Sequence, residues 1–86
     1  MCSYVTERSV VTGSAKGSSG WFRLSHATAY FDHPYFSPDE HTLNIDFVNE
    51  SEGPSARVAV ELTAGSAREL VRCIESALAS AGDLAS

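Results

Sequence analysis

The chain has 86 residues, of which 43% are hydrophobic and 20% are charged, and its formal net charge at pH 7 is −5. This length allows one domain with one modest core, and the composition is typical of a folded globular protein. The six Lys and Arg residues are scattered along the chain and form no basic stripe. Binding to nucleic acid or to an anionic membrane surface is therefore disfavoured.

The two cysteines, Cys2 and Cys73, indicate a reducing compartment rather than a disulfide framework. No apolar run reaches bilayer-spanning length, and the N-terminus lacks the basic and apolar regions of a signal peptide. We therefore expect a cytoplasmic location with both thiols reduced, which disfavours a Cys2–Cys73 disulfide. Cys73 lies on the flank of a predicted helix, where a small buried side chain is expected.

The first half of the chain reads as two strands joined by a flexible loop. Residues 4–12 are rich in β-branched side chains but carry charges mid-run, which favours an edge strand. Residues 13–20 are rich in glycine and serine and predict a hairpin loop. Residues 21–32 predict a longer strand with apolar side chains on both faces, typical of a central strand covered on both sides. One helix covers only one face, so a partner copy is the simplest cover for the other.

The second half begins with a proline-containing loop at 34–39 and continues with two strands. Residues 40–49 and 56–63 both alternate apolar and polar side chains, the pattern of strands with one dry face. The short polar turn between them predicts antiparallel pairing. The dry-face residues are Leu43, Ile45, Phe47, Val58, Val60 and Leu62.

The pattern then changes from a period of two to 3.6, which predicts a C-terminal helix. Thr63 or Ser66 is expected to cap its start, and Gly82 to end it. Residues 83–86 are expected to fray. The prediction is an α+β fold for the single domain 1–86: a four-stranded antiparallel sheet in the order β-β-β-β-α, with the helix packed on one face. The helix stripe is Ala67, Leu70, Val71, Ile74, Ala77, Leu78 and Ala81.

The opening Met-Cys suggests a metal site. A small second residue permits removal of the initiator Met, which would give Cys2 a free amine beside its thiol, a chelating pair for a transition metal. His33 and His41 could add imidazole ligands, and the adjacent Asp32 and Glu40 could orient or ligate. The two histidines are separated by a loop, so this spacing is compatible with their convergence but does not require it.

Two other arrangements remain open at this stage. Cys2 could act as a nucleophile with His33 or His41 as base and Asp32 as its orienting group. Asp46 lies on the strand face opposite the helix, where burial in a dimer would require a partner such as Arg23 or Arg57. Polar and aromatic neighbours suited to a binding cavity or patch are Asn44, Tyr35 and Phe36.

Several segments of the chain carry a resemblance to a known family: Met1–Tyr4, Gly13–Gly17, Gly20–Phe22, Asp32–Pro34, Glu40–Phe47, Gly53–Thr63 and the C-terminal helix. Through them the chain resembles, over nearly its full length, a family of small actinobacterial proteins of unassigned function. The resemblance implies a bacterial, cytoplasmic setting and brings no activity, cofactor or substrate with it.

Two functions are therefore expected as alternatives. The first is a small cytoplasmic metal-binding protein, or a metalloenzyme acting on a small molecule by an oxidative or hydrolytic step, with one copper, nickel, iron or zinc ion at Cys2, His33 and His41. The second is a non-catalytic homodimeric module that binds a small molecule or a protein. Its dimer would form on the sheet face opposite the helix, and its aromatic patch would be Trp21, Tyr30, Tyr35 and Phe36.

Overall fold

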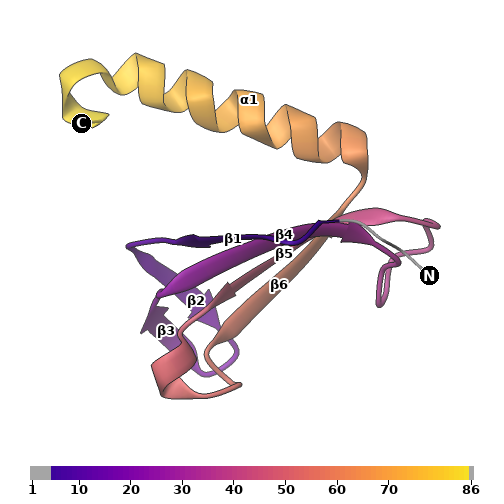
Figure 1. Cartoon of the computed structure of the whole chain (residues 1–86). Coiled ribbons are helices and arrows are strands. Elements are labelled where there is room, and N and C mark those ends of the chain that lie inside the picture. The colour runs from indigo at the N-terminus through magenta and orange to yellow at the C-terminus, as the bar shows by residue number, and fades with distance from the viewer. Residues whose placement is uncertain (1–4, 86) are drawn as a thin grey trace.

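The computed structural model of the protein describes residues 5–85 and has an α+β architecture (Figure 1). It confirms an antiparallel four-stranded sheet, sheet A, with one C-terminal α-helix, and it adds a separate two-stranded sheet, sheet B. Sheet A has the order β1-β4-β5-β6, so β1 is an edge strand as its charges predicted. The elements are β1 Glu7–Val10, β2 Ser14–Gly17, β3 Gly20–Arg23, β4 His26–Asp32, β5 Thr42–Val48, η1 Glu50–Glu52, β6 Arg57–Leu62, α1 Ala64–Ala81 and η2 Gly82–Ala85.

Sheet B corrects the prediction of a loop at 13–20 followed by one strand at 21–32. The glycine-rich segment contains β2, which pairs antiparallel with β3. The chain then leaves sheet B at Leu24 and Ser25, whose backbone N–H groups donate to the oxygens of Gly13 (2.9 Å) and Val48 (2.8 Å). The apolar side chains on both faces of 21–32 therefore belong to two strands in two sheets, and not to one central strand.

The two faces of sheet A differ sharply in chemistry. Along β4, β5 and β6 the register aligns Phe31 with Leu43 and Leu62, and repeats this apolar pattern in two further rows. We call this side the apolar face; its residues are Ala27, Ala29, Phe31, Leu43, Ile45, Phe47, Val58, Val60 and Leu62. Alternation places the intervening residues on the other side, the polar face: His26, Thr28, Tyr30, Asp32, Thr42, Asn44, Asp46, Val48, Arg57, Ala59 and Glu61.

The turn between β5 and β6 is built by Asn49 and Gly53. The Asn49 side chain accepts from the backbone N–H of Ser51 at 3.0 Å and donates to the oxygen of Arg23 at 2.8 Å. Gly53 has a φ of 88°, which side chains with a Cβ rarely adopt. The turn thereby fixes the predicted antiparallel pairing of β5 with β6.

Helix α1 begins and ends where the sequence predicted. The Thr63 side chain accepts from the backbone N–H of Ser66 at 3.1 Å, and Gly82 is the C-cap. Beyond it, η2 forms a 3₁₀ turn where fraying was expected. Neither α1 nor any other described helix has the combination of length and hydropathy needed to span a bilayer.

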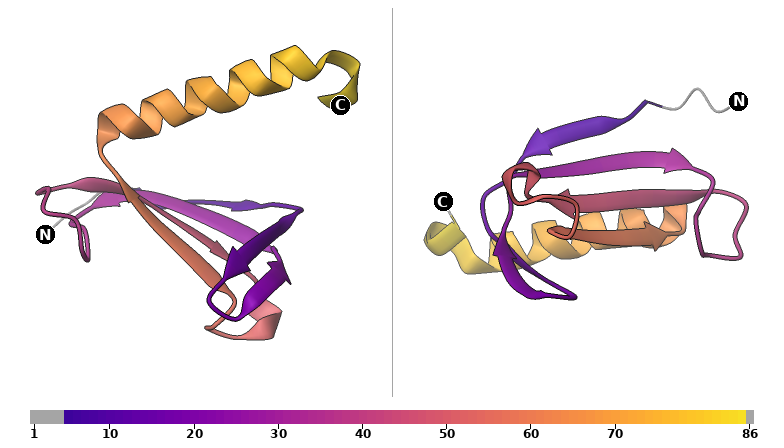
Figure 2. Two further views of the ribbon diagram at one scale, coloured as in Figure 1. Left: turned by 180° about the vertical axis from the view of Figure 1, so that it is seen from behind. Right: turned by 90° about the horizontal axis from the view of Figure 1, so that it is seen from below.

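The expected packing of α1 on one face of the sheet is only partial, because α1 contacts β5 and β6 without burying any of its own residues. The helix leaves the end of β6 and runs over the apolar face, but it diverges from the sheet along its length (Figures 1 and 2). No residue of α1 is buried. Cys73, expected to be a small buried residue, is a free and exposed thiol for the same reason.

Candidate functional site

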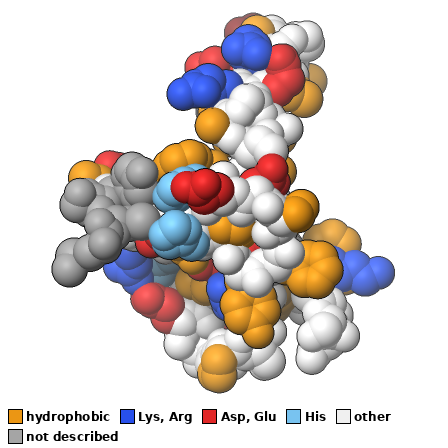
Figure 3. All heavy atoms as spheres, turned by 90° about the vertical axis from the view of Figure 1, so that its right-hand side faces the viewer, with side chains coloured by type: hydrophobic (Ala, Val, Ile, Leu, Met, Phe, Trp, Pro, Cys, Tyr) orange, Lys and Arg blue, Asp and Glu red, His pale blue; other side chains and the backbone are white. Residues whose placement is uncertain are grey.

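The β4–β5 register brings His33 and His41 together. The last pair in this ladder is Asp32 with Thr42, and the two histidines are the next residues outward on each strand. Their ring centroids lie 4.6 Å apart with an interplanar angle of 28°. The ring of Phe31 stacks on His41 with a centroid distance of 5.8 Å. Figure 3 shows histidine side chains gathered at the surface of this end of the molecule.

Glu40 contacts both imidazoles. Nδ1 of His33 lies 3.2 Å from the backbone oxygen of Glu40, and Nδ1 of His41 lies 3.9 Å from its carboxylate Oε1. A carbonyl oxygen only accepts, so Nδ1 of His33 is the donor in this contact, which in the neutral ring leaves the lone pair on Nε2. Asp32 was expected to orient or ligate in this site, and its Oδ1 accepts from the His33 backbone N–H at 2.7 Å.

The complete metal site predicted from the sequence extends beyond the described residues, because Cys2 lies outside them. Within residues 5–85, no group of three or more His, Cys, Asp or Glu side chains is arranged to hold a metal ion. His33 is exposed, and the side chain of His41 retains 27% of its accessible surface. The structure therefore assembles two imidazoles with a carboxylate beside them, and both rings reach solvent.

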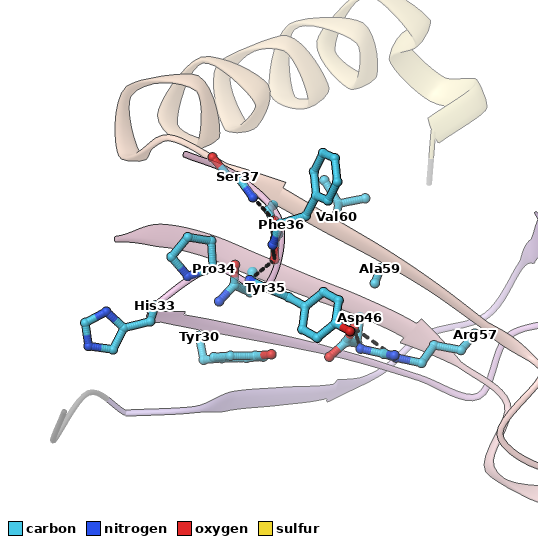
Figure 4. Close-up of a pocket in the computed structure, with 12 residues that line it drawn as sticks. Tyr30, His33, Pro34, Tyr35, Phe36, Ser37, Asp46, Arg57, Ala59 and Val60 are labelled. Carbon is cyan, nitrogen blue, oxygen red and sulfur yellow. Dashed lines mark hydrogen bonds and ion pairs between the residues drawn. The ribbon is translucent and has the colours of Figure 1, made fainter. Parts of the chain in front are cut away.

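A cavity of about 770 Å3 lies on the polar face beside this pair (Figure 4). Its floor is formed by side chains of β4, β5 and β6, including Tyr30 and Asp46, and the loop 33–37 forms one wall. His33 lines the cavity as well, so the histidine pair stands at its edge. In Figure 4 the side chains of Tyr30, Asp46 and Arg57 project from the side of the sheet opposite α1.

The floor of the cavity is a satisfied polar network. Oδ1 of Asp46 accepts from Nη2 of Arg57 at 2.7 Å and from its Nε at 3.1 Å. Of the two arginines suggested as partners of Asp46, Arg57 is therefore the one that pairs with it. Asn44 is 6% exposed and accepts through Oδ1 from the hydroxyl of Thr42 at 2.7 Å, while Thr42 is fully buried. These bonds hold the floor side chains in place without a ligand.

Glu61 anchors the loop that walls the cavity, a role the sequence did not suggest. Its carboxylate accepts from three consecutive backbone N–H groups: those of Tyr35, Phe36 (3.1 Å) and Ser37 (2.9 Å). The bonds from Ser37, Tyr35 and Phe36 hold the pKa of Glu61 below its ordinary value, against the smaller opposing effect of desolvation. An outward Glu in an edge strand is ordinary, so its sequence pattern gave no signal.

The anchored loop presents its aromatic side chains to solvent. Tyr35 is 99% exposed and Phe36 is 90% exposed, although their backbone groups are fixed by Glu61. Both residues line the cavity together with Tyr30. Trp21, the fourth member of the aromatic patch expected from sequence, lies in sheet B and does not line this cavity.

A family model covers nearly the whole chain. Residues 1–85 match the model described as a family of unknown function (DUF6295). The chain belongs to this family. No curated protein and no solved structure matches the chain. Membership in DUF6295 agrees with the resemblance to a family of unassigned function and adds no ligand, activity or partner to the geometry above.

Proposed function

We propose that this DUF6295 protein binds one transition metal ion, copper, nickel, iron or zinc, through the imidazoles of His33 and His41. The observation that carries the proposal is the stacked pair at 4.6 Å with Nδ1 of His33 held by the backbone oxygen of Glu40. Histidine ligands of metals commonly donate their second ring N–H to a carbonyl or carboxylate, which fixes the tautomer and presents the other nitrogen. Imidazole nitrogen suits all four of these metals.

Cys2 is the third ligand of the proposed site. β1 runs antiparallel to β4, so its Glu7 end points toward the His33 end of β4. Cys2 precedes Glu7 by five residues, and five extended residues span up to about 17 Å. Cys2 supplies a thiolate, which with the two imidazoles gives a mixed N/S donor set.

Metal titration of protein carrying any affinity tag after Ser86, away from Cys2, tests this proposal. We expect one equivalent of Cu2+, Ni2+ or Zn2+ to bind. His33→Ala and His41→Ala should each weaken binding by about 10- to 100-fold or more, and Cys2→Ser should abolish the thiolate-to-metal charge-transfer band with Cu2+ or Co2+.

The third histidine of the chain provides a matched control. His26 lies in β4, with Nδ1 2.9 Å from the Ser25 hydroxyl and 3.3 Å from the Glu50 carboxylate. His26→Ala should leave metal affinity unchanged. Equal losses for His26→Ala and His41→Ala, or no stoichiometric binding by the unmodified chain, would refute the metal site.

A second candidate function is small-molecule binding in the cavity on the polar face. The specific observation is that Tyr30, Tyr35 and the Arg57–Asp46 pair surround about 770 Å3 beside His33. Pockets of this size with a few placed polar groups commonly bind drug-sized molecules. Together the two candidates describe a metalloenzyme whose metal stands at the edge of its substrate cavity.

Chemical-shift mapping with a panel of small aromatic and carboxylic acids checks this second candidate. We expect shifts to cluster at Tyr30, Tyr35 and Arg57, and Tyr35→Ala to weaken them. Shifts that spread evenly over residues 5–85, or that persist in Tyr35→Ala, would count against the cavity as a binding site.

A further inference from the structure

The apolar face of sheet A is only partly covered by the chain that carries it. Its members come from three adjacent strands and form a continuous grid, yet none of them is buried. One flank of this face, formed by Ala27, Ala29 and Ile45, is hollowed into a shallow depression that extends to β1. A face of this composition normally packs against another layer of structure.

The apolar stripe of α1 is equally open. Its large members retain between 41% and 55% of their accessible surface: Leu70 41%, Val71 55%, Ile74 50% and Leu78 54%. Hydrophobic side chains are visible on the helix and on the sheet, with the helix standing apart (Figure 3). The two open surfaces match in length, since 18 helical residues span about 27 Å and a seven-residue strand about 24 Å.

The described residues consequently lack a hydrophobic core. Ala56 is their one buried hydrophobic residue. The chain exposes 6473 Å2, about 1,500 Å2 more than a compact protein of 9.2 kDa exposes. Its radius of gyration is 14.3 Å, against about 12 Å for a compact chain of this length. A chain this short gains little folding stability from an apolar layer that stays partly exposed.

We propose that a second copy of this chain covers the apolar face and the α1 stripe, forming a two-fold symmetric dimer. Each copy carries both an open apolar sheet face and an open amphipathic helix, so two copies satisfy each other through the same surfaces, as an isologous interface requires. If each copy buries its surplus of about 1,500 Å2 of accessible surface, the dimer interface buries about 3,000 Å2 in total. This area lies within the range of obligate homodimers.

The charge pattern agrees with a protein partner and opposes a lipid surface. The helix carries Arg68 and Arg72 together with Glu69 and Glu75, and Arg72 is paired with Glu69 at 2.5 Å. This balance offers no excess of basic groups to an anionic membrane. A partner that completes the core must be present whenever the chain folds. A second copy of the chain is the one partner whose presence is guaranteed, because it is made together with the first.

The proposed interface differs from the one predicted from sequence. The dimer was expected on the sheet face opposite the helix, the polar face to which Asn44 and Ala59 belong. That face carries the cavity, and Asn44 is already buried and hydrogen-bonded within the chain. The apolar grid and the helix stripe lie on the other side of the sheet, so variants on the two faces separate the two interfaces.

The first test uses the unmodified chain. Sedimentation equilibrium should give twice the 9.2 kDa chain mass. In urea, the unfolding midpoint should fall by about 0.5 M for each tenfold dilution, because a dimer unfolds with a change in particle number. A cooperatively folded monomer whose midpoint does not depend on concentration would overturn the proposal.

The second test compares substitutions of matched chemistry. Ile74→Asp places a charge on the helix stripe and should raise the dimer dissociation constant by about 100-fold or more, or unfold the chain. Ser76→Asp places the same charge on the exposed opposite side of the helix and should leave the dimer intact. Ala59→Asp, on the polar face of the sheet, should also leave it intact.

Three outcomes contradict the proposed interface. The first is a dimer that survives Ile74→Asp, and the second is equal disruption by Ile74→Asp and Ser76→Asp. The third is dissociation by Ala59→Asp alone, which would place the interface on the polar face. A stable monomer that binds lipid vesicles through α1 would assign the stripe to a membrane and overturn the dimer.

Discussion

The two faces of sheet A differ in how far one chain completes them. On the polar face, Thr42 is fully buried and Asn44 is 6% exposed, and among the described residues no buried side-chain nitrogen or oxygen lacks a hydrogen-bond partner. On the apolar face, none of the grid residues is buried. Among the described residues, buried polar groups thus find their partners within one chain, whereas the apolar side chains of the sheet do not become buried within one chain.

The difference follows from the range of the two interactions. A hydrogen bond needs one donor and one acceptor a few ångströms apart, which neighbouring positions supply within one strand, as for Thr42 with Asn44, or across two paired strands, as for Asp46 with Arg57. Removing apolar area from water needs a second layer of structure. The one helix contacts β5 and β6 but diverges from the sheet along its length, so it supplies only part of that layer.

Truncation on the apolar face should have the largest effect on stability. Ile45→Ala should lower the free energy of unfolding by about 3 kcal/mol, because in the dimer this side chain lies in a packed core. Val10→Ala, at a site 76% exposed on the edge strand, should cost less than about 0.5 kcal/mol. Urea denaturation at one fixed protein concentration measures both. Similar losses in the free energy of unfolding at the two sites would mean that the apolar face remains exposed to solvent.

Removing charge on the polar face should have a smaller effect. Asp46→Asn should cost about 1 kcal/mol, because the Asp46 side chain is only 19% exposed and accepts two bonds from Arg57. Glu69→Gln breaks a comparable pair with Arg72 that is 65–67% exposed, and should cost about 0.3 kcal/mol. Thermal unfolding of both variants provides the comparison. An equal cost would show that burial of Asp46 adds nothing.

Acid should release the aromatic loop with little change elsewhere. The pKa of Glu61 is lowered by its bonds from Ser37, Tyr35 and Phe36, so the anchor is complete above the ordinary carboxyl pKa and is lost as pH falls through the lowered value. Amide exchange at Tyr35–Ser37 should be protected at pH 7, and Glu61→Gln should remove that protection. Full protection in Glu61→Gln would contradict the anchor.

Local features of the chain were predictable because they depend on near neighbours. The alternation at 43–47 and 58–62 predicted two antiparallel strands with one apolar face, and the 3.6-residue period predicted α1 with its Thr63 cap. The split of residues 21–32 into β3 and β4 was not predictable from apolar content, since a central strand gives the same pattern.

The candidate site was predictable in part. His33 and His41 were selected by residue type, and extending the β4–β5 register by one pair would have placed them opposite each other. Glu61 could not be found this way, because its role depends on three backbone N–H groups that a distant loop presents. Cys2 lies outside the described residues, so its part in the site is still a prediction.

The sequence by itself determined which side chains are apolar, where they recur and which face of each element they occupy, because these follow from the periods of strand and helix. Only the tertiary structure decided whether those faces meet. The helix stripe and the sheet grid are both present as predicted, yet they do not bury each other, because the path of the chain after Thr63 sets their separation. The hydrophobic period of one chain does not specify the separation between helix and sheet. In the proposed dimer, a second copy fills that separation.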